Sequence, residues 1–238
     1  MRIAVLTTIT SHHAYFIKKL ISHGHEVRAF IETKKRKKYQ FKTIHKIDND
    51  TEKFEQKIWF NNLKPNINKI CKNYKSSNIN NVSIEKKILE YDPELIFVFG
   101  TGIIGSKIIN NHHNIIYNFH GGHPEYYRGL DTNLWAIYHN QFNMLMTCLH
   151  KLDKKFDNGN IFKLKKIKIN KSTKIEEIRS KNTYLCIKLA MELIKMYIAK
   201  NKIVLKKQER KGRFYSAMPG ILKEECVLNF KKYIMRLK

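Results

Sequence analysis

The sequence is poor in several features that define whole classes of protein. Its 238 residues include only four prolines and two tryptophans. No apolar run approaches the 18 or more residues of a membrane-spanning helix, so we expect no membrane insertion. The four cysteines are far apart and form no Cys-x-x-Cys motif, which argues against a disulfide framework or a cysteine zinc site. They are Cys71, Cys148, Cys186 and Cys226.

The N-terminus lacks the pattern of an export signal. Its apolar run ends at Leu6, and Thr7 and Thr8 follow at once, so the run is too short for a signal peptide. It predicts a first β-strand instead. We therefore expect a cytoplasmic protein whose cysteines stay reduced.

Acidic residues and arginine are also scarce. The chain has 20 Asp and Glu and 46 Lys and Arg, which gives a formal net charge of +26. Only eight of the basic residues are arginine. Lys, Ile and Asn have A/T-rich codons, so genomic bias accounts for much of this charge. Arginine recognises phosphates and bases better than lysine does. Because arginine is scarce here, we expect no nucleic-acid partner. The charge would still attract small polyanions.

Apolar runs alternate with helical patterns along the chain. Runs at 2–7 and 25–31 flank a helical pattern at 13–23, which predicts a right-handed β-α-β unit. We therefore expect an α/β fold, a Rossmann-like open, mostly parallel sheet with helices on both faces. The other predicted elements are a largely helical stretch at 50–91, strands at 95–99, 114–119, 143–150 and 160–169, a helix at 131–139 capped by Asp131, and a long helix that begins with a Thr173/Glu176 capping box.

Glycine is placed unevenly. Six of the ten glycines lie within residues 100–129, at the ends of two predicted neighbouring strands. Open α/β sheets bind ligands at that edge, and glycine lets a ligand approach the backbone. The glycines therefore indicate the position of a site.

The first of these glycines match the G-x-G-x-x-G pattern of dinucleotide-binding proteins. That fingerprint requires a full helix and then a strand that ends in an acidic residue about 20 positions further on. After Gly105 the next strand begins near Asn114, which leaves no room for an ordinary crossover helix. We therefore expect no NAD or NADP binding and interpret 100–105 as a turn that lines a flat ligand.

Asn118 and His120 lie two residues apart in a predicted strand, so their side chains point to the same face. An amide beside an imidazole can stabilise an oxyanion and move a proton. A core histidine beside a turn-forming asparagine would show the same spacing. Asp157 follows a later strand and could orient His120, although an ordinary Asp-x-Gly turn would look the same. His120 and His123 lack a third ligand nearby, so no metal is expected.

The order of these parts resembles the catalytic domain of the 10-formyltetrahydrofolate-dependent formyltransferases. Asn-x-His is followed by Tyr-Arg-Gly at 127–129, by Thr147-x-x-His150 and by Asp-x-Gly-x-Ile from Asp157. The similarity extends from Asp92 through Gln208 to the Tyr-Ser-Ala-Met-Pro segment at 215–219. It implies a catalytic domain over 1–200 with a small C-terminal extension over 201–238, which we expect to be a hairpin and a helix.

The resemblance implies transfer of a formyl group from N10-formyltetrahydrofolate to an amine. Asn118 would stabilise the oxyanion, His120 would take the amine proton or polarise the carbonyl, and Asp157 would orient His120. The family most often has Pro-Ser-Leu-Leu-Pro after the histidine, whereas this chain has Gly-Gly-His-Pro. The expected folate contacts are Phe99, Gly100, Gly102, Ile103, Gly121, Gly122, His123, Pro124, Asp153, Lys155 and Phe156.

Among the acceptors that the family uses, the sequence favours a nucleotide-linked amino sugar. Glycinamide ribonucleotide enzymes carry a Gly/Ser-rich loop where residues 7–13 of this chain hold no glycine. Methionyl-tRNA enzymes carry a C-terminal barrel of roughly a hundred residues, and only about 30 residues follow Gln208. Our best expectation is dTDP-4-amino-4,6-dideoxyglucose, modified for surface polysaccharide or O-antigen biosynthesis.

The expected acceptor contacts combine aromatic and basic side chains. Phe214 and Tyr215 could stack a thymine or uracil, although core packing would explain them equally well. Arg128 could bind the pyrophosphate, and His12 lies in the loop after the first strand. Exposed apolar residues near the C-terminus would suit a homodimer, and the sequence leaves the oligomeric state open. A basic RNA-binding protein is the alternative from another class, and its binding would not depend on Asn118 or His120.

Overall fold

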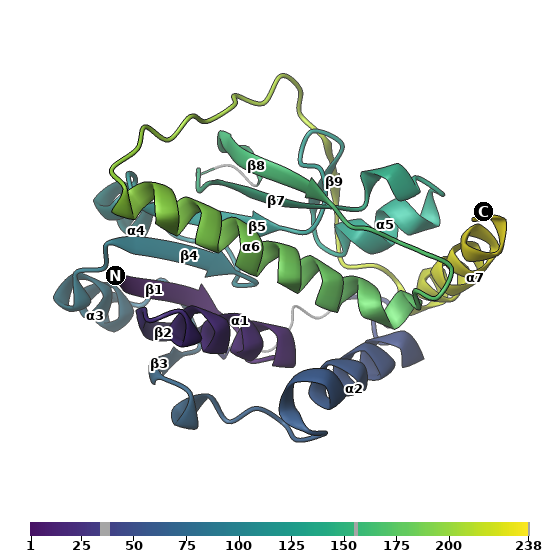
Figure 1. Cartoon of the computed structure of the whole chain (residues 1–238), viewed down its shortest axis with the longest axis horizontal. Coiled ribbons are helices and arrows are strands. Elements are labelled where there is room, and N and C mark those ends of the chain that lie inside the picture. The colour runs from purple at the N-terminus through teal and green to yellow at the C-terminus, as the bar shows by residue number, and fades with distance from the viewer. Residues whose placement is uncertain (34–38, 155–156, 238) are drawn as a thin grey trace.

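The computed structural model describes residues 1–33, 39–154 and 157–237. Within them a seven-stranded sheet has the order β3-β2-β1-β4-β5-β7-β8 (Figure 1). The first five strands in that order are parallel, and β7 runs antiparallel to both of its neighbours. The predicted Rossmann-like, mostly parallel sheet is therefore confirmed. The strands are β1 (Arg2–Thr7), β2 (Glu26–Glu32), β3 (Lys72–Ser76), β4 (Leu95–Phe99), β5 (Ile116–His120), β7 (Met146–Lys151) and β8 (Ile161–Lys166).

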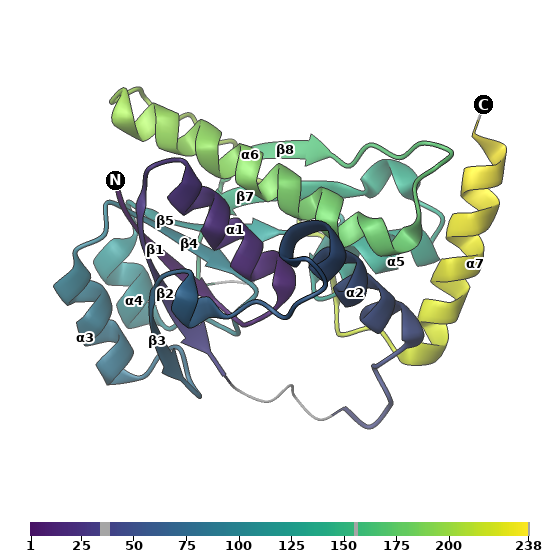
Figure 2. The same ribbon diagram turned by 60° about the horizontal axis from the view of Figure 1, so that its bottom comes forward.

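Helices cover both faces of the sheet (Figures 1 and 2). Alternate residues of β1 explain why its run is apolar throughout, because Ile3 and Val5 pack on one side and Ala4 and Leu6 on the other. The first side is covered by α1 (Ser11–Ser22) and α6 (Ile178–Ile198), and the second by α3 (Val82–Tyr91) and α4 (Ser106–His112). In the described part of the chain no helix is long and apolar enough to cross a membrane.

A smaller layer lies beside the main sheet. In it β6 (Tyr127–Gly129) pairs in parallel with β9 (Arg213–Tyr215), and α5 (Thr132–Tyr138) packs against α7 (Gly220–Arg236). Residues from before and after position 200, among them Ile137 and Phe230, share one hydrophobic cluster there. The expected C-terminal hairpin is wrong, since β9 pairs with β6 far back in the chain. The expected C-terminal helix is confirmed as α7.

Two elements were missed between the predicted strands. The stretch 50–91 is not helical throughout: α2 (Lys46–Phe60) and α3 are separated by β3, which pairs only with β2. As an edge strand β3 needs little apolar surface, and its main packing contact stacks Tyr74 on Phe30 with ring centres 5.4 Å apart. Between β4 and β5, where no ordinary crossover helix was expected to fit, the short, seven-residue α4 was missed.

Two predicted helix caps are wrong as well. The Thr173 hydroxyl accepts from the backbone N–H of Asn170, 3.1 Å away, while Glu177 and not Glu176 accepts from the backbone at Lys174, at 3.2 Å. Asp131 precedes α5 without capping it. Its carboxylate accepts from the N–H of Met218 at 2.8 Å, which ties the start of α5 to the C-terminal segment.

Candidate active site

The three predicted catalytic side chains meet at the carboxyl end of β5. Asn118 and His120 lie on that strand, and Asp157 lies in the turn between β7 and β8. His120 Nδ1 is 3.4 Å from Asp157 Oδ1. The Asn118 amide nitrogen is 3.5 Å from the same oxygen. Oδ1 of Asp157 therefore lies close to both Asn118 and His120, although the Asn-x-His and Asp-x-Gly motifs are far apart in the sequence.

A fourth side chain, His150, belongs to this group and was absent from the predicted site. It lies on β7 directly opposite Asn118, and its Nε2 is 3.1 Å from the Asn118 amide nitrogen. Its Nδ1 donates to the carbonyl of Lys151 at 2.7 Å, so Nε2 carries the lone pair and accepts from Asn118. His150 thereby fixes the orientation of the Asn118 amide. The Thr147-x-x-His150 motif contained the signal, but the pairing of β5 with β7 was needed to use it.

The backbone holds Asp157 in an unusual conformation. Its φ is 47°, in the left-handed region, which costs a residue with a side chain of the order of 1 kcal/mol. Its Oδ2 accepts from the N–H of Gly129 at 2.8 Å. Gln208 donates to the carbonyls of both Asp157 and Gly159, at 2.8 and 2.9 Å. This many tethers distinguish the turn from an ordinary Asp-x-Gly turn.

Burial and charge set the protonation of His120 and Asp157. Burial lowers the pKa of His120, and the attraction of Asp157 only partly offsets it, so the imidazole is neutral near pH 7. Burial would raise the pKa of Asp157, but His120, His150 and the Gly129 N–H outweigh it and hold that pKa well below its usual range. The site thus pairs an ionised carboxylate with a neutral imidazole.

The hydrogen bond from His120 to the backbone determines which ring nitrogen can take a proton. Nε2 lies 2.8 Å from the carbonyl of Tyr127, which only accepts, so Nε2 carries the hydrogen of the neutral ring. Nδ1 then holds the lone pair and faces Asp157. A proton taken up by His120 arrives at Nδ1, where the carboxylate stabilises the imidazolium.

Side chains from the end of β2 and from the turn before α3 hold the glycine turn after β4. The N–H of Gly102 donates to Glu32 at 2.7 Å, and that of Gly105 donates to Asn80 at 2.6 Å. Asn80 also donates to the carbonyl of Ile103 at 2.8 Å, and the Ile103 side chain is 62% exposed. The turn therefore presents an apolar side chain to solvent from a well-anchored backbone.

Two glycines lie against neighbouring histidines. At Gly100 φ is +82°, and a Cβ there would lie 2.5 Å from the ring of His13, which also packs on Phe99. At Gly122 φ is +153°, and a Cβ would lie 3.1 Å from the Thr132 hydroxyl and 3.2 Å from Nε2 of His120. Gly100 thus makes room for a side chain of this protein, in addition to any role beside a ligand.

The other expected folate contacts lie in the loops after β5 and β7. In the first loop Gly121 and Gly122 precede His123, which is half-buried with its ring against Tyr126 at 4.9 Å between centres, and the buried Pro124 follows it. Asp153 is exposed and lines a cavity of about 490 Å³ together with Gln208 and neighbouring residues. Lys155 and Phe156 lie outside the described residues.

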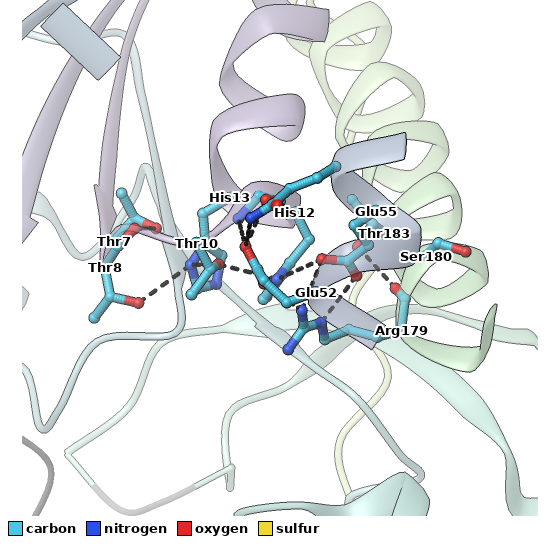
Figure 3. Close-up of polar contacts among 12 residues, drawn as sticks. Thr7, Thr8, Thr10, His12, His13, Glu52, Glu55, Arg179, Ser180 and Thr183 are labelled. Carbon is cyan, nitrogen blue, oxygen red and sulfur yellow. Dashed lines mark hydrogen bonds and ion pairs between the residues drawn. The ribbon is translucent and has the colours of Figure 1, made fainter. Parts of the chain in front are cut away.

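His12 belongs to a partly buried polar network that we call the helix brace, formed by Thr10, His12, Glu52, Glu55 and Arg179 (Figure 3). The guanidinium of Arg179 on α6 donates to Glu52 and Glu55 of α2 at 2.6 to 2.8 Å. His12 Nδ1 is 3.0 Å from the Thr10 hydroxyl and 3.6 Å from Glu55. Burial, together with Arg179, holds the pKa of His12 well below its usual range. The helix brace joins α1, α2 and α6 just after the end of β1, the strand that lies between β2 and β4.

The ribbon formed by β6 and β9 brings the other expected acceptor contacts together. Arg128 is paired with Phe214 across the ribbon, and its Nε donates to the carbonyl of Gly212 at 2.9 Å. Tyr215 stacks on Tyr127 with ring centres 5.2 Å apart and also packs against Trp135. Phe214 is 51% exposed. Of the two aromatics, Phe214 therefore has the larger surface available to a ligand.

Comparison with known families identifies the class of protein that has this fold and site. A family model described as formyl transferase matches residues 1–189. The match covers most of the chain, and the chain belongs to this formyl transferase family. A search of curated proteins finds no match.

Several solved structures have the same fold. HypX from Aquifex aeolicus has a TM-score of 0.63 at 14% identity over 98% of this chain, which spans only 35% of HypX. A sugar N-formyltransferase from a Shewanella species has a TM-score of 0.62 at 13% identity, covering 96% of this chain and 87% of that protein. PseJ from Anoxybacillus kamchatkensis, solved with UDP-4,6-dideoxy-4-formamido-L-AltNAc and tetrahydrofolate, has a TM-score of 0.53 at 19% identity, covering 91% and 86%. At these identities the likeness is one of fold.

Proposed function

We propose that this protein transfers a formyl group from N10-formyltetrahydrofolate to the amine of a nucleotide-linked amino sugar. The observation that carries the proposal is the convergence of Asn118 and His120 on the carboxylate of Asp157, in a chain of the formyl transferase family. The acceptor class is supported by the two sugar formyltransferase structures, most of whose length this chain covers.

The residues around the site fit a reduced folate. The anchored turn at 100–105 offers the exposed Ile103 to a flat ring, and the glycine at 122 lets the loop pass close to His120. When bound, the folate supplies a formyl carbon that the acceptor amine attacks. The ionised Asp157 and the neutral His120 suit the remaining task, which is the removal of a proton from that amine.

Each polar side chain then has a separate role. Asn118 gives one amide hydrogen to His150 and would turn the other from Asp157 Oδ1, 3.5 Å away, to the formyl oxygen as negative charge develops there. His120 takes the amine proton at Nδ1, and Asp157 stabilises the resulting imidazolium. His120 would then return this proton to N10 of the folate, whose bond to the formyl carbon breaks as the tetrahydrofolate leaves. His150 is a positioning residue in this scheme.

The particular acceptor that we propose is dTDP-4-amino-4,6-dideoxyglucose, used in the cytoplasm for surface polysaccharide. Phe214 supports stacking of the base, because half of its surface is exposed and it is paired with Arg128 across the ribbon. The packing of Tyr215 on Tyr127 makes it the weaker candidate.

An acceptor panel tests the proposal. The protein is incubated with N10-formyltetrahydrofolate and dTDP- or UDP-linked amino sugars, glycinamide ribonucleotide or initiator methionyl-tRNA, and each acceptor is weighed by mass spectrometry. We expect one formyl group to be gained by an amino sugar, and Asn118→Ala to abolish most of that gain. Formylation of only the ribonucleotide or the tRNA would contradict the acceptor class. Salt-sensitive RNA binding that Asn118→Ala leaves unchanged, without formylation of any acceptor, would favour an RNA-binding protein.

A further inference from the structure

Gln208 connects the C-terminal extension to the turn that holds Asp157. Its side-chain nitrogen donates to the carbonyl of Asp157 at 2.8 Å and to the carbonyl of Gly159 at 2.9 Å. A carboxamide nitrogen has two hydrogens, and two carbonyls that only accept show which end of the group is nitrogen. Gln208 lies beyond residue 189, where the match to the family model ends. The catalytic cluster is therefore held in part from outside the matched region.

Hydrogen bonds on both sides of Gln208 fix its place along the chain. Two residues before it, Lys206 forms an antiparallel bridge with Ile161, with backbone hydrogen bonds of 2.7 and 2.8 Å. Directly after it, the N–H of Glu209 donates to the carboxylate of Glu125 at 2.5 Å. The chain that returns from α6 to β9 is thus attached to the start of β8 and to the loop between β5 and β6 (Figure 1). Gln208 lies between these two attachments.

The turn needs such a tether because its conformation is not one that an aspartate prefers. Asp157 has a φ of 47°, and a left-handed residue with a side chain persists only where the surrounding structure holds it. The N–H of Gly129 binds the end of the side chain, at Oδ2. Gln208 binds the backbone, at the carbonyls of Asp157 and Gly159. The two tethers act on different parts of the residue, so the direction of Oδ1 depends on both.

We propose that Gln208 is a positioning residue for formyl transfer, which keeps Asp157 Oδ1 facing His120 Nδ1 through the backbone of the Asp157 turn. The inference rests on the proposed function for the role of Asp157 in the reaction, but not for its placement. Without the two hydrogen bonds the turn can relax towards a commoner φ, and Oδ1 then moves away from a ring nitrogen that is already 3.4 Å distant. An error of about 1 Å in the position of a catalytic group can cost about 10²-fold in rate.

Asn229 provides a matched comparison within the same extension. It lies on α7, and its side-chain nitrogen donates to the carbonyl of Tyr138, at the end of α5, at 3.1 Å. Like Gln208, it joins the extension to the backbone of an earlier element, but Tyr138 is not part of the catalytic cluster. Loss of either amide should lower the stability of the fold, and only the loss of Gln208 should lower kcat.

Steady-state kinetics of Gln208→Met test the positioning role. Methionine has a similar length and cannot donate a hydrogen bond. We expect kcat to fall about 10- to 100-fold, with folate binding by calorimetry retained. The acid limb of the pH profile of kcat/KM should move to lower pH, because an imidazolium farther from Asp157 is less stable. Gln208→Glu keeps the shape and loses the donors, and it should lower kcat at least as much.

Asn229→Leu is the control, and it should keep the wild-type kcat and pH profile. Circular dichroism and urea unfolding show that each variant is folded and how much stability it has lost. A wild-type kcat and pH profile in a folded Gln208→Met would overturn the proposal. So would a loss of kcat in Asn229→Leu equal to that in Gln208→Met, because the effect would then follow stability alone.

Crystal structures of the wild-type protein and Gln208→Met test the placement without any substrate. The distance from Asp157 Oδ1 to His120 Nδ1 should be longer in the variant by about 0.5–1 Å. An unchanged distance would overturn the proposal whatever the kinetics. A displaced Asp157 in a protein that formylates no amino sugar would support the placement by Gln208 and count against the proposed function instead.

Discussion

Two polar clusters lie near the carboxyl edge of the sheet, and they differ in how closely side chains approach the carboxylate oxygens, since Asp157 Oδ1 has only long contacts although its Oδ2 accepts from Gly129 at 2.8 Å. In the helix brace, Arg179 lies 2.6 to 2.8 Å from the oxygens of Glu52 and Glu55. Around Asp157 Oδ1 the contacts from His120, Asn118 and His150 are 3.4 to 3.6 Å long. Both clusters contain histidines with lowered pKa values, so residue type alone does not separate them.

The difference in length has a physical consequence. Hydrogen bonds between charged groups at 2.6 to 2.8 Å are near their optimum, so any shift of the helices weakens them. Contacts of 3.4 Å and more are well short of that optimum. The Asp157 oxygen can therefore gain a stronger hydrogen bond when His120 takes up a proton at Nδ1. We infer that the first cluster stabilises the fold and that the second is prepared for a change of charge.

The largest expected effect separates the clusters by activity. Asp157→Asn keeps the shape of the side chain but removes the charge that stabilises the imidazolium. We expect kcat to fall about 10²–10⁴-fold. The midpoint of chemical unfolding should fall as well, because the lowered pKa of Asp157 means that its charge also stabilises the folded protein. Steady-state kinetics and urea unfolding of the same variant measure both quantities, and a normal kcat would remove Asp157 from the mechanism.

The second prediction breaks the helix brace. Arg179→Met removes the cation from the fully buried Glu55, and an uncompensated buried charge is costly. We expect the free energy of unfolding to fall by about 3 kcal/mol. The control is Arg2→Met, which breaks the exposed ion pair with Asp92 and should cost less than about 1 kcal/mol. Equal losses in the two variants would show that the helix brace is no more than a surface contact.

A third test asks whether Gly100 serves His13 or a ligand. Gly100→Ala places a Cβ at positive φ and 2.5 Å from the His13 ring, so we expect a loss of about 2 kcal/mol of unfolding free energy. Removing the ring with His13→Ala should make the same glycine substitution less costly. A double-mutant cycle from urea unfolding gives this coupling. Unchanged stability in Gly100→Ala, together with lost folate binding, would assign the glycine to the ligand alone.

The fourth prediction concerns pH. His12, His13 and His120 have lowered pKa values mainly because they are buried, so they stay neutral in the folded protein below pH 6.5 while the unfolded chain takes up protons. Stability must therefore fall as the pH drops below 6.5, by up to about 1.4 kcal/mol per unit for each histidine. The lowered pKa of Asp157 acts in the same direction only below about pH 4. Urea unfolding at neutral and mildly acidic pH should show the loss, and His12→Asn should reduce its slope. A stability that rises on acidification would contradict these assignments.

Much of the fold could be predicted because its signals are local. The buried runs that became β1 and β4, and the shared face of Asn118 and His120, follow from strand periodicity within a few residues. By contrast β3 has a polar sequence and is a strand only because β2 offers it an edge. The pairing of β9 with β6 likewise depends on a chain segment far away, so a hairpin was the closest local interpretation.

The same division applies to the candidate site. Asp157 was found because its turn follows a strand, but its tethers to Gly129 and Gln208 come from other parts of the chain. His150 required knowledge that β7 lies beside β5. Arg179 gave no signal at all, because its partners Glu52 and Glu55 are on another helix more than a hundred residues earlier.

Formyl transfer by His120→Asn tests the central claim most directly. The substitution removes the base but keeps a polar side chain of similar reach, and it leaves Asn118, His150 and Asp157 in place. With N10-formyltetrahydrofolate and the best amino-sugar acceptor, we predict a kcat about 10²–10⁴-fold below that of the wild-type protein, with folate binding by calorimetry retained. A kcat close to the wild-type value would contradict the account, because a reaction that proceeds without His120 is not carried out by this cluster.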